Sequence, residues 1–271
     1  MQQLEFDTDI IEISNGNFFK LSSRQFLNRC PYTEDQLGKI SPRIFKPFDR
    51  MSKIDGGYFE SCVKNSFPEL EQRTHFLNKF YQCLLCNQLP IKTRKVCMVG
   101  PSDSGKSSLA AVLFGLTHPE KVSAISKEKT FGLSMINEDT QLIFIDELSG
   151  ETLSADQAKV FLQGGMLTVA KKHANARIVE NFAGIYITCN TFPEYGIEQK
   201  NIERRLDIFH TNSLTEKCPK AVCWLKDNAF MVLMWIVNEI KRNNRLIERT
   251  ASETITKRKL LSSTSKLLGR F

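Results

Sequence analysis

Short, continuous apolar runs recur through the middle of the chain and predict buried strands. They read "KVCMV" at 95–99, "LIFI" at 142–145 and "GIYITC" at 184–189. Stretches of helical length separate them, at 105–115 and 154–163. Buried strands that alternate with helices are typical of a parallel sheet covered by helices on both faces. The pattern therefore predicts an α/β fold.

The two ends of the chain carry other patterns. Apolar residues recur with helical spacing at 22–30 and 71–85, and a loop containing Pro and Gly separates these stretches. One long helix is predicted at 223–245, and the Ser/Thr/Lys-rich tail that follows predicts disorder. The expected organisation is a small N-terminal helical region at 1–90, an α/β core at 91–215, a C-terminal helix packed on the core at 216–249 and a basic tail at 250–271.

Composition indicates one large core, and charge is unevenly placed. Of the 271 residues, 41% are hydrophobic and 25% are charged. The net charge is +7, but residues 241–271 hold nine Lys or Arg and only two Asp or Glu, so the rest of the chain is neutral. A nucleic-acid partner would therefore need a local basic site on the core.

Neither a leader nor a membrane segment is expected. The stretch "MQQLEFDTDIIEIS" lacks the apolar core of a signal peptide, and the longest apolar stretch, at 229–237, is too short to cross a bilayer. We expect a protein that is not secreted, with reduced thiols at its eight cysteines. Cys83 and Cys86 have the spacing of half a zinc site, but no second pair follows. We favour two small apolar residues on a helix face.

The sequence "GPSDSGKS" at 100–107 fits the phosphate-loop pattern G-x-x-x-x-G-K-[ST]. Its glycines let successive N–H groups surround a phosphate, and the helix that follows adds its positive end. Lys106 is expected to reach the β- and γ-phosphates of ATP, and Ser107 to supply an oxygen to Mg²⁺. A plain Gly/Ser-rich turn is the alternative, which the flanking strand and helix disfavour. The expected nucleotide-binding residues are Gly100, Pro101, Ser102, Asp103, Ser104, Gly105, Lys106, Ser107 and Ser108.

Polar residues end two further predicted strands. Asp146 and Glu147 follow "LIFI", and Asn190 follows "GIYITC". Beside a phosphate loop, Asp146 suits the Mg²⁺ shell and Glu147 suits the polarisation of an attacking water. The Asn190 amide can hydrogen-bond that water and the γ-phosphate, although an Asn after a strand is usually a turn residue.

Two further groups of cations are candidates. Lys171, Lys172 and His173 lie between two β-forming runs and predict the tip of a hairpin. Alone, such a tip is a solvated turn, but its position between the acid pair and Asn190 favours contact with nucleic acid. Arg204 and Arg205 precede a predicted strand. Arginine there can stabilise the transferred phosphoryl group from a neighbouring subunit, and ordinary surface arginines are the alternative.

The order of these motifs resembles that of the superfamily 3 helicases, a branch of the AAA+ ATPases found in small DNA viruses and some RNA viruses. The resemblance covers about 70–215 and rests on "GPSDSGKS", "LIFIDE", "VAKKHANARIVENFAGIYITCN" and "NIERRLDIF". The papillomavirus replicative helicases are the nearer likeness and the parvovirus replication proteins the more distant one.

The resemblance implies a DNA helicase that uses ATP and Mg²⁺ and acts in viral or virus-like DNA replication. It implies a homo-hexameric ring around single-stranded DNA, with ATP sites between subunits and residues 1–90 where the family has its oligomerisation collar. A nuclear location follows, with the cytoplasm as the alternative. The implied catalytic residues are Lys106, Asp146, Glu147, Asn190 and Arg205, the metal ligands Ser107 and Asp146, and the DNA-binding residues Lys172 and His173. Arg204 has no clear counterpart.

Some features depart from the family. Many members carry an origin-nicking domain with a His-hydrophobic-His pair, which the four histidines here do not form. A separate origin-binding protein is therefore expected as a partner. Two other functions stay open: an RNA helicase of the RNA-virus branch, and an ATPase switch that does not unwind nucleic acid.

Overall fold

The structure is a computed structural model that describes residues 5–86, 88–90, 92–126, 132–169, 177–214 and 218–268. At its centre is a five-stranded sheet in which every neighbouring pair is parallel. Its strands, in spatial order, are β13 (Leu206–His210), β7 (Lys95–Val99), β12 (Gly184–Cys189), β9 (Leu142–Ile145) and β8 (Val122–Ile125). The predicted α/β fold with a parallel sheet is confirmed.

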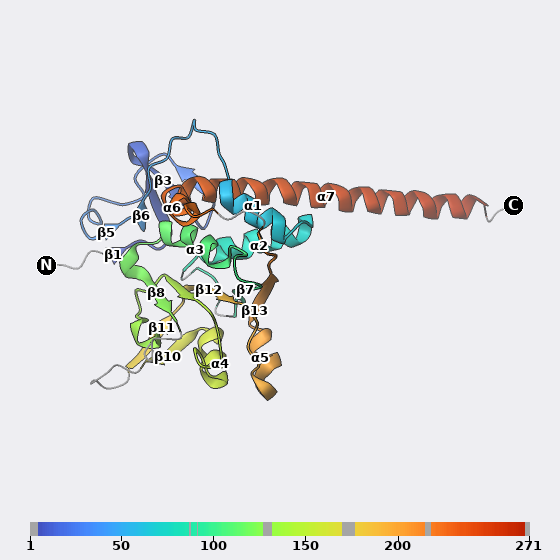
Figure 1. Cartoon of the computed structure of the whole chain (residues 1–271). Coiled ribbons are helices and arrows are strands. Elements are labelled where there is room, and N and C mark those ends of the chain that lie inside the picture. The colour runs from blue at the N-terminus through green and yellow to red at the C-terminus, as the bar shows by residue number, and fades with distance from the viewer. Residues whose placement is uncertain are drawn as a thin grey trace.

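Two apolar clusters cover the two faces of this sheet, as the continuous apolar strands require. Strand side chains such as Met98 and Phe144 join the first cluster, and Cys97 and Ile143 join the second. The first cluster is completed by α1 (Gly57–Ser66), α2 (Leu70–Gln82), α3 (Lys106–Gly115), α6 (Ala221–Asp227) and α7 (Ala229–Leu268). The second is completed by α4 (Ala155–Gln163) and α5 (Gln199–Glu203) (Figure 1).

Several predicted elements are confirmed in detail. Helix α4 begins at a capping box, in which the Ser154 hydroxyl accepts from the backbone N–H of Gln157 and the Gln157 side chain accepts in return. It ends at Gly164, whose φ of 77° few other residues adopt. Strand β8 was not predicted, because "VSAI" at 122–125 is short and interrupted by a serine.

The N-terminal region is only partly helical, so the prediction for 1–90 was wrong over its first half. Helices α1 and α2 are present, but residues 5–45 form short strands. They are β1 (Glu5–Phe6) paired with β5 (Ile40–Ser41), and a sheet of β4 (Gln25–Leu27), β3 (Asn17–Lys20), β2 (Ile10–Ile13) and β6 (Ile44–Phe45). The expected helix at 22–30 is β4 because its Phe26 packs against Phe19 of the neighbouring strand.

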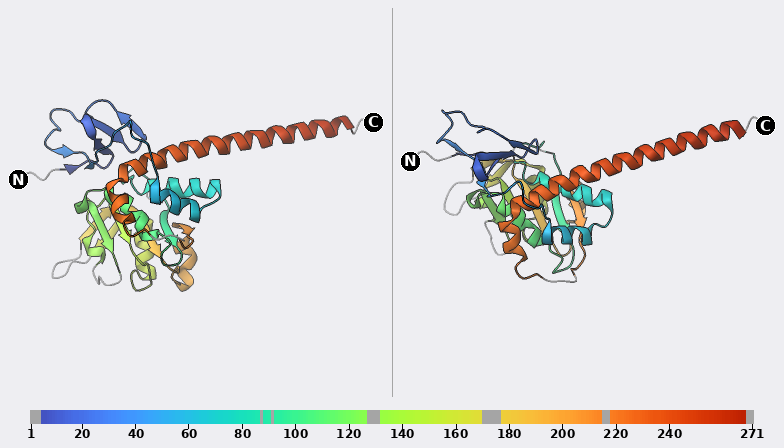
Figure 2. Two further views of the ribbon diagram at one scale, coloured as in Figure 1. Left: turned by 45° about the horizontal axis from the view of Figure 1, so that its top comes forward. Right: turned by 90° about the horizontal axis from the view of Figure 1, so that it is seen from above.

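The C-terminal prediction also needs two corrections. The single helix expected at 223–245 is broken at Asn228, between α6 and α7. The tail expected to be disordered instead continues α7 to Leu268, because no Gly or Pro interrupts the chain between Ala229 and that residue. The far half of α7 extends away from the rest of the molecule (Figure 2).

Candidate nucleotide site

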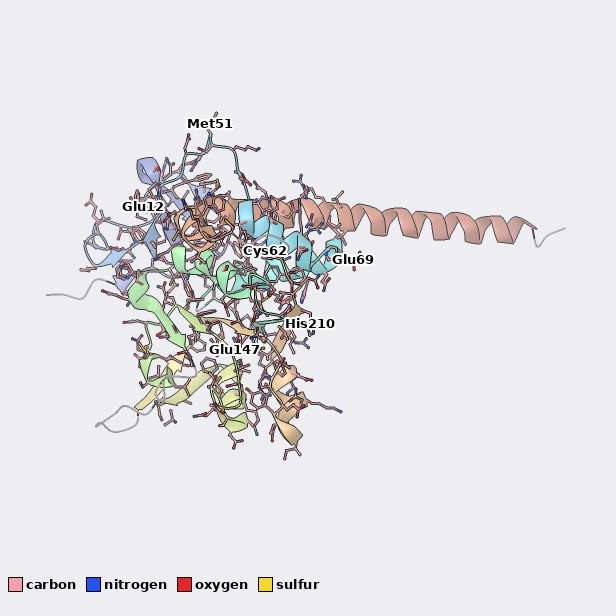
Figure 3. All side chains as sticks on the ribbon, in the orientation of Figure 1. Glu12, Met51, Cys62, Glu69, Glu147 and His210 are labelled. Atoms are coloured by element: carbon pink, nitrogen blue, oxygen red, sulfur yellow. The ribbon has the colours of Figure 1, made fainter. Side chains whose placement is uncertain are left out.

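The phosphate loop joins the carboxyl end of β7 to the first residue of α3, as predicted. Asp103 and Gly105 both have positive φ, 60° and 82°, which turns neighbouring N–H groups toward one side of the loop. A Cβ at Gly105 would come within 2.9 Å of the Cys62 sulfur on α1, so both the conformation and the space require glycine. Figure 3 labels Cys62, whose helix packs directly on this loop.

The other side chains of the loop divide into buried and exposed ones. Ser104 is buried, and its hydroxyl is hydrogen-bonded to that of Thr211, 2.8 Å away. This side chain therefore anchors the loop to the protein interior. Pro101, Ser102 and Asp103 are exposed. Of the expected nucleotide contacts, Ser104 is therefore restricted to its backbone N–H.

Lys106 folds back over the loop. Its Nζ donates to the carbonyls of Gly100 and Pro101, at 2.7 and 2.6 Å, and to Asn190 Oδ1 at 3.2 Å. Burial lowers the pKa of Lys106, and the carboxylates of Glu147 and Asp146 oppose that change. The ammonium is held at the site that the motif predicts, with acceptors that phosphate oxygens can replace.

Ser107 and Asp146 lie together. The Ser107 hydroxyl donates to Asp146 Oδ1 at 2.9 Å, and the Thr188 hydroxyl donates to the same oxygen at 2.8 Å. One hydroxyl and one carboxylate are hard oxygen donors of the kind Mg²⁺ takes, and Mg²⁺ commonly needs only one or two carboxylates beside phosphate oxygens. The residues predicted as metal ligands therefore fit this ion. Sequence analysis missed Thr188, whose only signal is a hydroxyl within an apolar strand.

Glu147 lies between this pair and Asn190. Its φ of 56° is rare for a residue with a side chain and turns the carboxylate toward the end of β12. Its Oε1 accepts from the backbone N–H of Asn190 at 3.2 Å, and its own N–H donates to the Thr188 hydroxyl at 3.4 Å. Glu147, labelled in Figure 3, is exposed.

Sheet order explains why these residues meet. Along the chain the strands follow the order β7, β9, β12, but in the sheet β12 lies between the other two. A parallel sheet collects the carboxyl ends of its strands at one edge, and a change of strand order opens a crevice there. The phosphate loop, the acid pair and Asn190 end these three neighbouring strands and so share that crevice.

Arg205 lies at the opposite edge of the sheet. Its carbonyl accepts from Lys95 N–H at 2.9 Å, at the start of β7, whereas the phosphate loop follows the end of that strand. Five strand residues span about 15 Å, so Arg205 does not join the Lys106 cluster of its own chain. Its guanidinium donates to the Asn201 carbonyl and to Gln163 Oε1, the latter at 3.3 Å.

A basic hollow surrounds Arg205. It has a volume of about 540 Å³ and is lined by Lys92, Thr93, Arg94, Leu162, Gln163, Arg204 and Arg205. Arg94 also pairs with the buried Asp207, 3.8 Å away. Lys92 and Arg94 were not predicted, although "KTRK" just before β7 is a basic run. Lys92, Arg94, Arg204 and Arg205 give this hollow a positively charged lining, which attracts anions.

The predicted hairpin is present as β10 (Gly165–Val169) and β11 (Arg177–Asn181), paired antiparallel. Its tip, with Lys171, Lys172 and His173, lies outside the described residues, so the DNA-binding role of Lys172 and His173 stays a prediction. On the strands, Met166 and Ile178 are exposed, at 70% and 66% of their surface, which sequence analysis did not foresee.

Cys83 and Cys86 lie just after α2 and are buried. Their sulfurs contact the carbonyls of Ile185 and Thr140, at 3.5 and 3.8 Å. Burial raises the pKa of Cys83 to about 12 and that of Cys86 to about 11, so both stay protonated thiols at neutral pH. Among the described residues, no three His, Cys, Asp or Glu side chains group as metal ligands would.

Comparison with known proteins supports the fold. A family model described as a family of unknown function (DUF5906) matches residues 98–205, which run from the end of β7 to Arg205. Among solved structures, the A form of the apo C-terminal region of NrS-1 gives a TM-score of 0.50 at 14% identity, over 76% of this chain and 53% of that one.

Two other solved structures are less similar. A second A-form structure of the NrS-1 C-terminal region gives a TM-score of 0.48 at 16% identity, over 69% of this chain and 45% of that one. JCV helicase, solved with a bound small molecule, gives 0.45 at 20% identity, over 71% and 59%. The chain spans about half the length of these solved chains. No curated protein matches it.

The likeness to the NrS-1 C-terminal region, at 14% identity, supports the fold. Identity this low carries no more than the fold. Within the part of the chain that the structure describes, no helix combines the length and apolar character that a bilayer crossing needs.

Proposed function

We propose that the chain is the motor of an ATP-dependent DNA helicase, which works as a homo-hexameric ring on single-stranded DNA in viral or virus-like replication. One observation carries the proposal. Lys106, Ser107, Asp146, Glu147 and Asn190 converge at one edge of the sheet, as a phosphate-binding and hydrolytic site requires. A nuclear site of action and a separate origin-binding protein belong to the same proposal.

Nucleotide binding would replace contacts that Lys106 makes within the phosphate loop. The Lys106 ammonium exchanges the carbonyls of Gly100 and Pro101 for β- and γ-phosphate oxygens of ATP. The phosphate loop and the start of α3 supply N–H groups. Mg²⁺, held by Ser107 and Asp146, would neutralise charge on the phosphates.

Hydrolysis needs a positioned water. The Glu147 carboxylate accepts a proton from the water that attacks the γ-phosphorus, and the P–O bond to the β-phosphate breaks to release ADP and phosphate. The Asn190 side chain, 3.2 Å from Lys106 Nζ, lies where an amide donates to a γ-phosphate oxygen and to that water. Glu147 and Asn190 are kept together by the bond from the Asn190 backbone N–H.

The arginine comes from a neighbouring subunit in this proposal. Arg205 and its hollow lie at the sheet edge away from Lys106, so one chain has both halves of a site but cannot join them. A head-to-tail contact would bring Arg205, Lys92 and Arg94 to the next subunit's phosphates. A head-to-tail contact repeated from subunit to subunit forms a closed ring when the rotations between subunits add up to a full turn.

The hairpin would carry the DNA contact. Lys172 would meet phosphates, and His173 would stack or hydrogen-bond, which suits movement that ignores sequence because every nucleotide presents a phosphate. An ATPase switch has no need for these two cations. An RNA helicase would use them equally well, so substrate tests must decide between DNA and RNA.

A strand-displacement assay tests this function. The full chain, with ATP and Mg²⁺, is given forked DNA and forked RNA of the same sequence, and displaced strand is measured. Displacement of the DNA strand supports the proposal. Displacement of RNA alone favours the RNA-virus branch, and hydrolysis without displacement of either favours the switch.

A further inference from the structure

The far end of α7 leaves the body of the protein. Among the side chains that the structure describes, Asn243 is the last that is buried, at 0% exposure, and Asn244, Arg245 and Leu246 are exposed. Figures 1 and 2 show the helix passing α2 and continuing away from the rest of the molecule in each of their views. At about 1.5 Å per residue, the stretch from 247 to 268 extends about 30 Å. So long a helix without a packing partner needs another source of stability.

The charge excess of the whole chain lies in its last thirty-one residues, which include the projecting helix. Residues 241–271 contain nine Lys or Arg and two Asp or Glu, whereas the remainder is neutral. Lys241, Arg245 and Arg249 follow one another at four-residue spacing, which places them on one side of a helix. This series starts on the body and continues along the projection.

The described part of this series is free of carboxylate partners. Arg242 pairs with Glu239 at 2.6 Å, but Lys241 and Arg245 have no ion pair among the side chains that the structure describes. Both are exposed on the surface of α7, beside Asn238, Arg242 and Leu246. Exposed, unneutralised cations in a row are a surface for a polyanion.

The apolar residues argue against two other partners. Ile247, Ala251 and Ile255 begin a series at four-residue spacing, but Lys259 occupies its next position and Arg258 lies beside it. A helix that lies on a membrane or pairs with a second copy needs a continuous apolar stripe. Charge is therefore the main feature that this helix offers.

We infer that the exposed cations of α7, from Lys241 toward its C-terminal end, bind the phosphate backbone of nucleic acid, without sequence preference, as a second contact apart from the hairpin. Lys241 and Arg245 start this contact, and the sequence continues their four-residue spacing at Arg249. It adds affinity to the proposed motor and takes no part in the ATP site, which lies at the carboxyl ends of β7, β9 and β12.

The test replaces the three cations together, as Lys241→Gln, Arg245→Gln and Arg249→Gln. Ser262→Gln, Ser263→Gln and Ser265→Gln in the same helix form the matched control. Binding of the full chain to single-stranded and duplex DNA is measured by fluorescence anisotropy at about 50 and 200 mM salt. At the lower salt, affinity should fall about tenfold or more, and the salt slope on duplex should become shallower by about 0.9 for each lost phosphate contact.

Other readouts separate this inference from the helicase proposal. Basal ATP hydrolysis without nucleic acid should be unchanged in the triple variant, and a chain that stops after Leu246 should lose at least as much DNA affinity. Unchanged DNA affinity in the triple variant would overturn the inference. So would a loss confined to phosphatidylserine vesicles, or a change of oligomeric state alone. A chain that binds DNA through α7 but never unwinds it would refute only the helicase proposal.

Discussion

A single hydroxyl organises both acids of the candidate site. Thr188 is buried in β12, donates to Asp146 Oδ1 and accepts from the backbone N–H of Glu147. Because its hydroxyl contacts Asp146 and Glu147, Thr188 acts through these two acids as a positioning residue. Groups of this kind are known to tune metal affinity as strongly as some ligands do.

Thr188→Val tests that role at nearly constant volume. Asp146 loses one of its two hydroxyl donors, so its carboxylate should hold Mg²⁺ less well. The Mg²⁺ concentration that gives half-maximal ATP turnover should rise about tenfold. Thr188→Ser keeps the hydroxyl and should behave like the wild type. An unchanged Mg²⁺ dependence in the valine variant would contradict the role.

Glu147 and Lys106 should fail in different ways. Glu147→Gln keeps the shape of the side chain but cannot take a proton, so ATP should still bind while turnover falls by about 10²–10⁴-fold. Lys106→Ala removes the phosphate-binding ammonium and should abolish binding. Equilibrium binding of a fluorescent ATP analogue and phosphate release distinguish the two. Near-normal turnover in Glu147→Gln would exclude it as the base.

Elements were predictable where local pattern and tertiary context agree. The strands β7, β9 and β12 are continuous apolar runs because helices cover both faces of the sheet, and α4 carries its own cap and stop. The pattern failed at 22–30, where the apolar residues have helical spacing but residues 25–27 form β4 and pair with β3. Local spacing cannot report such pairing, because the partner strand supplies the stabilising contacts.

The residues of the site that belong to sequence motifs were predictable, and the others were not. Lys106 of the phosphate loop and the strand-end residues Asp146 and Asn190 were identified from their order, and the sheet brings them together. Thr188 and Lys92 were not, because a hydroxyl in a strand and a lysine before one have no distinctive spacing. The positions of Thr188 and Lys92 relative to the site depend on the order of strands in the sheet, and the sequence pattern does not reveal that order.

The hairpin makes a prediction of its own. Lys172→Ala combined with His173→Ala should remove most stimulation of ATP hydrolysis by single-stranded DNA and leave basal hydrolysis intact, because the tip lies apart from the phosphate loop along the chain. Steady-state turnover with and without DNA measures this. Lys171→Ala is the control, since that neighbour is expected to be solvated. Full stimulation in the double variant would contradict the proposed DNA contact of the hairpin tip.

On the scale of the whole molecule, one buried side chain joins the N-terminal strands to the core. Arg43 is 0% exposed and donates to the carbonyls of Thr8, Leu84 and Leu116 and to the Thr117 hydroxyl. Burial lowers its pKa to about 10, so it remains charged at neutral pH. These contacts and the shared apolar cluster make the N-terminal strands one body with the α/β core.

Arg43→Met should lower the free energy of unfolding by roughly 3–5 kcal/mol, because buried carbonyls lose a charged donor. Denaturant unfolding measures the change. Lys39→Met, on an exposed lysine nearby, should change stability by less than about 0.5 kcal/mol. Equal stability of the two variants would mean that the N-terminal strands are held by apolar contacts alone.

An ATP site shared between subunits should be restored when two chains that are inactive for different reasons assemble together. Lys106→Ala has a defective phosphate loop and an intact Arg205, and Arg205→Ala has the reverse. Each alone should show almost no DNA-stimulated ATP hydrolysis. Equal mixtures allowed to assemble with DNA should recover about one quarter of wild-type turnover, because that share of head-to-tail interfaces pairs two intact halves. Turnover that stays at the level of the separate variants would contradict a shared site.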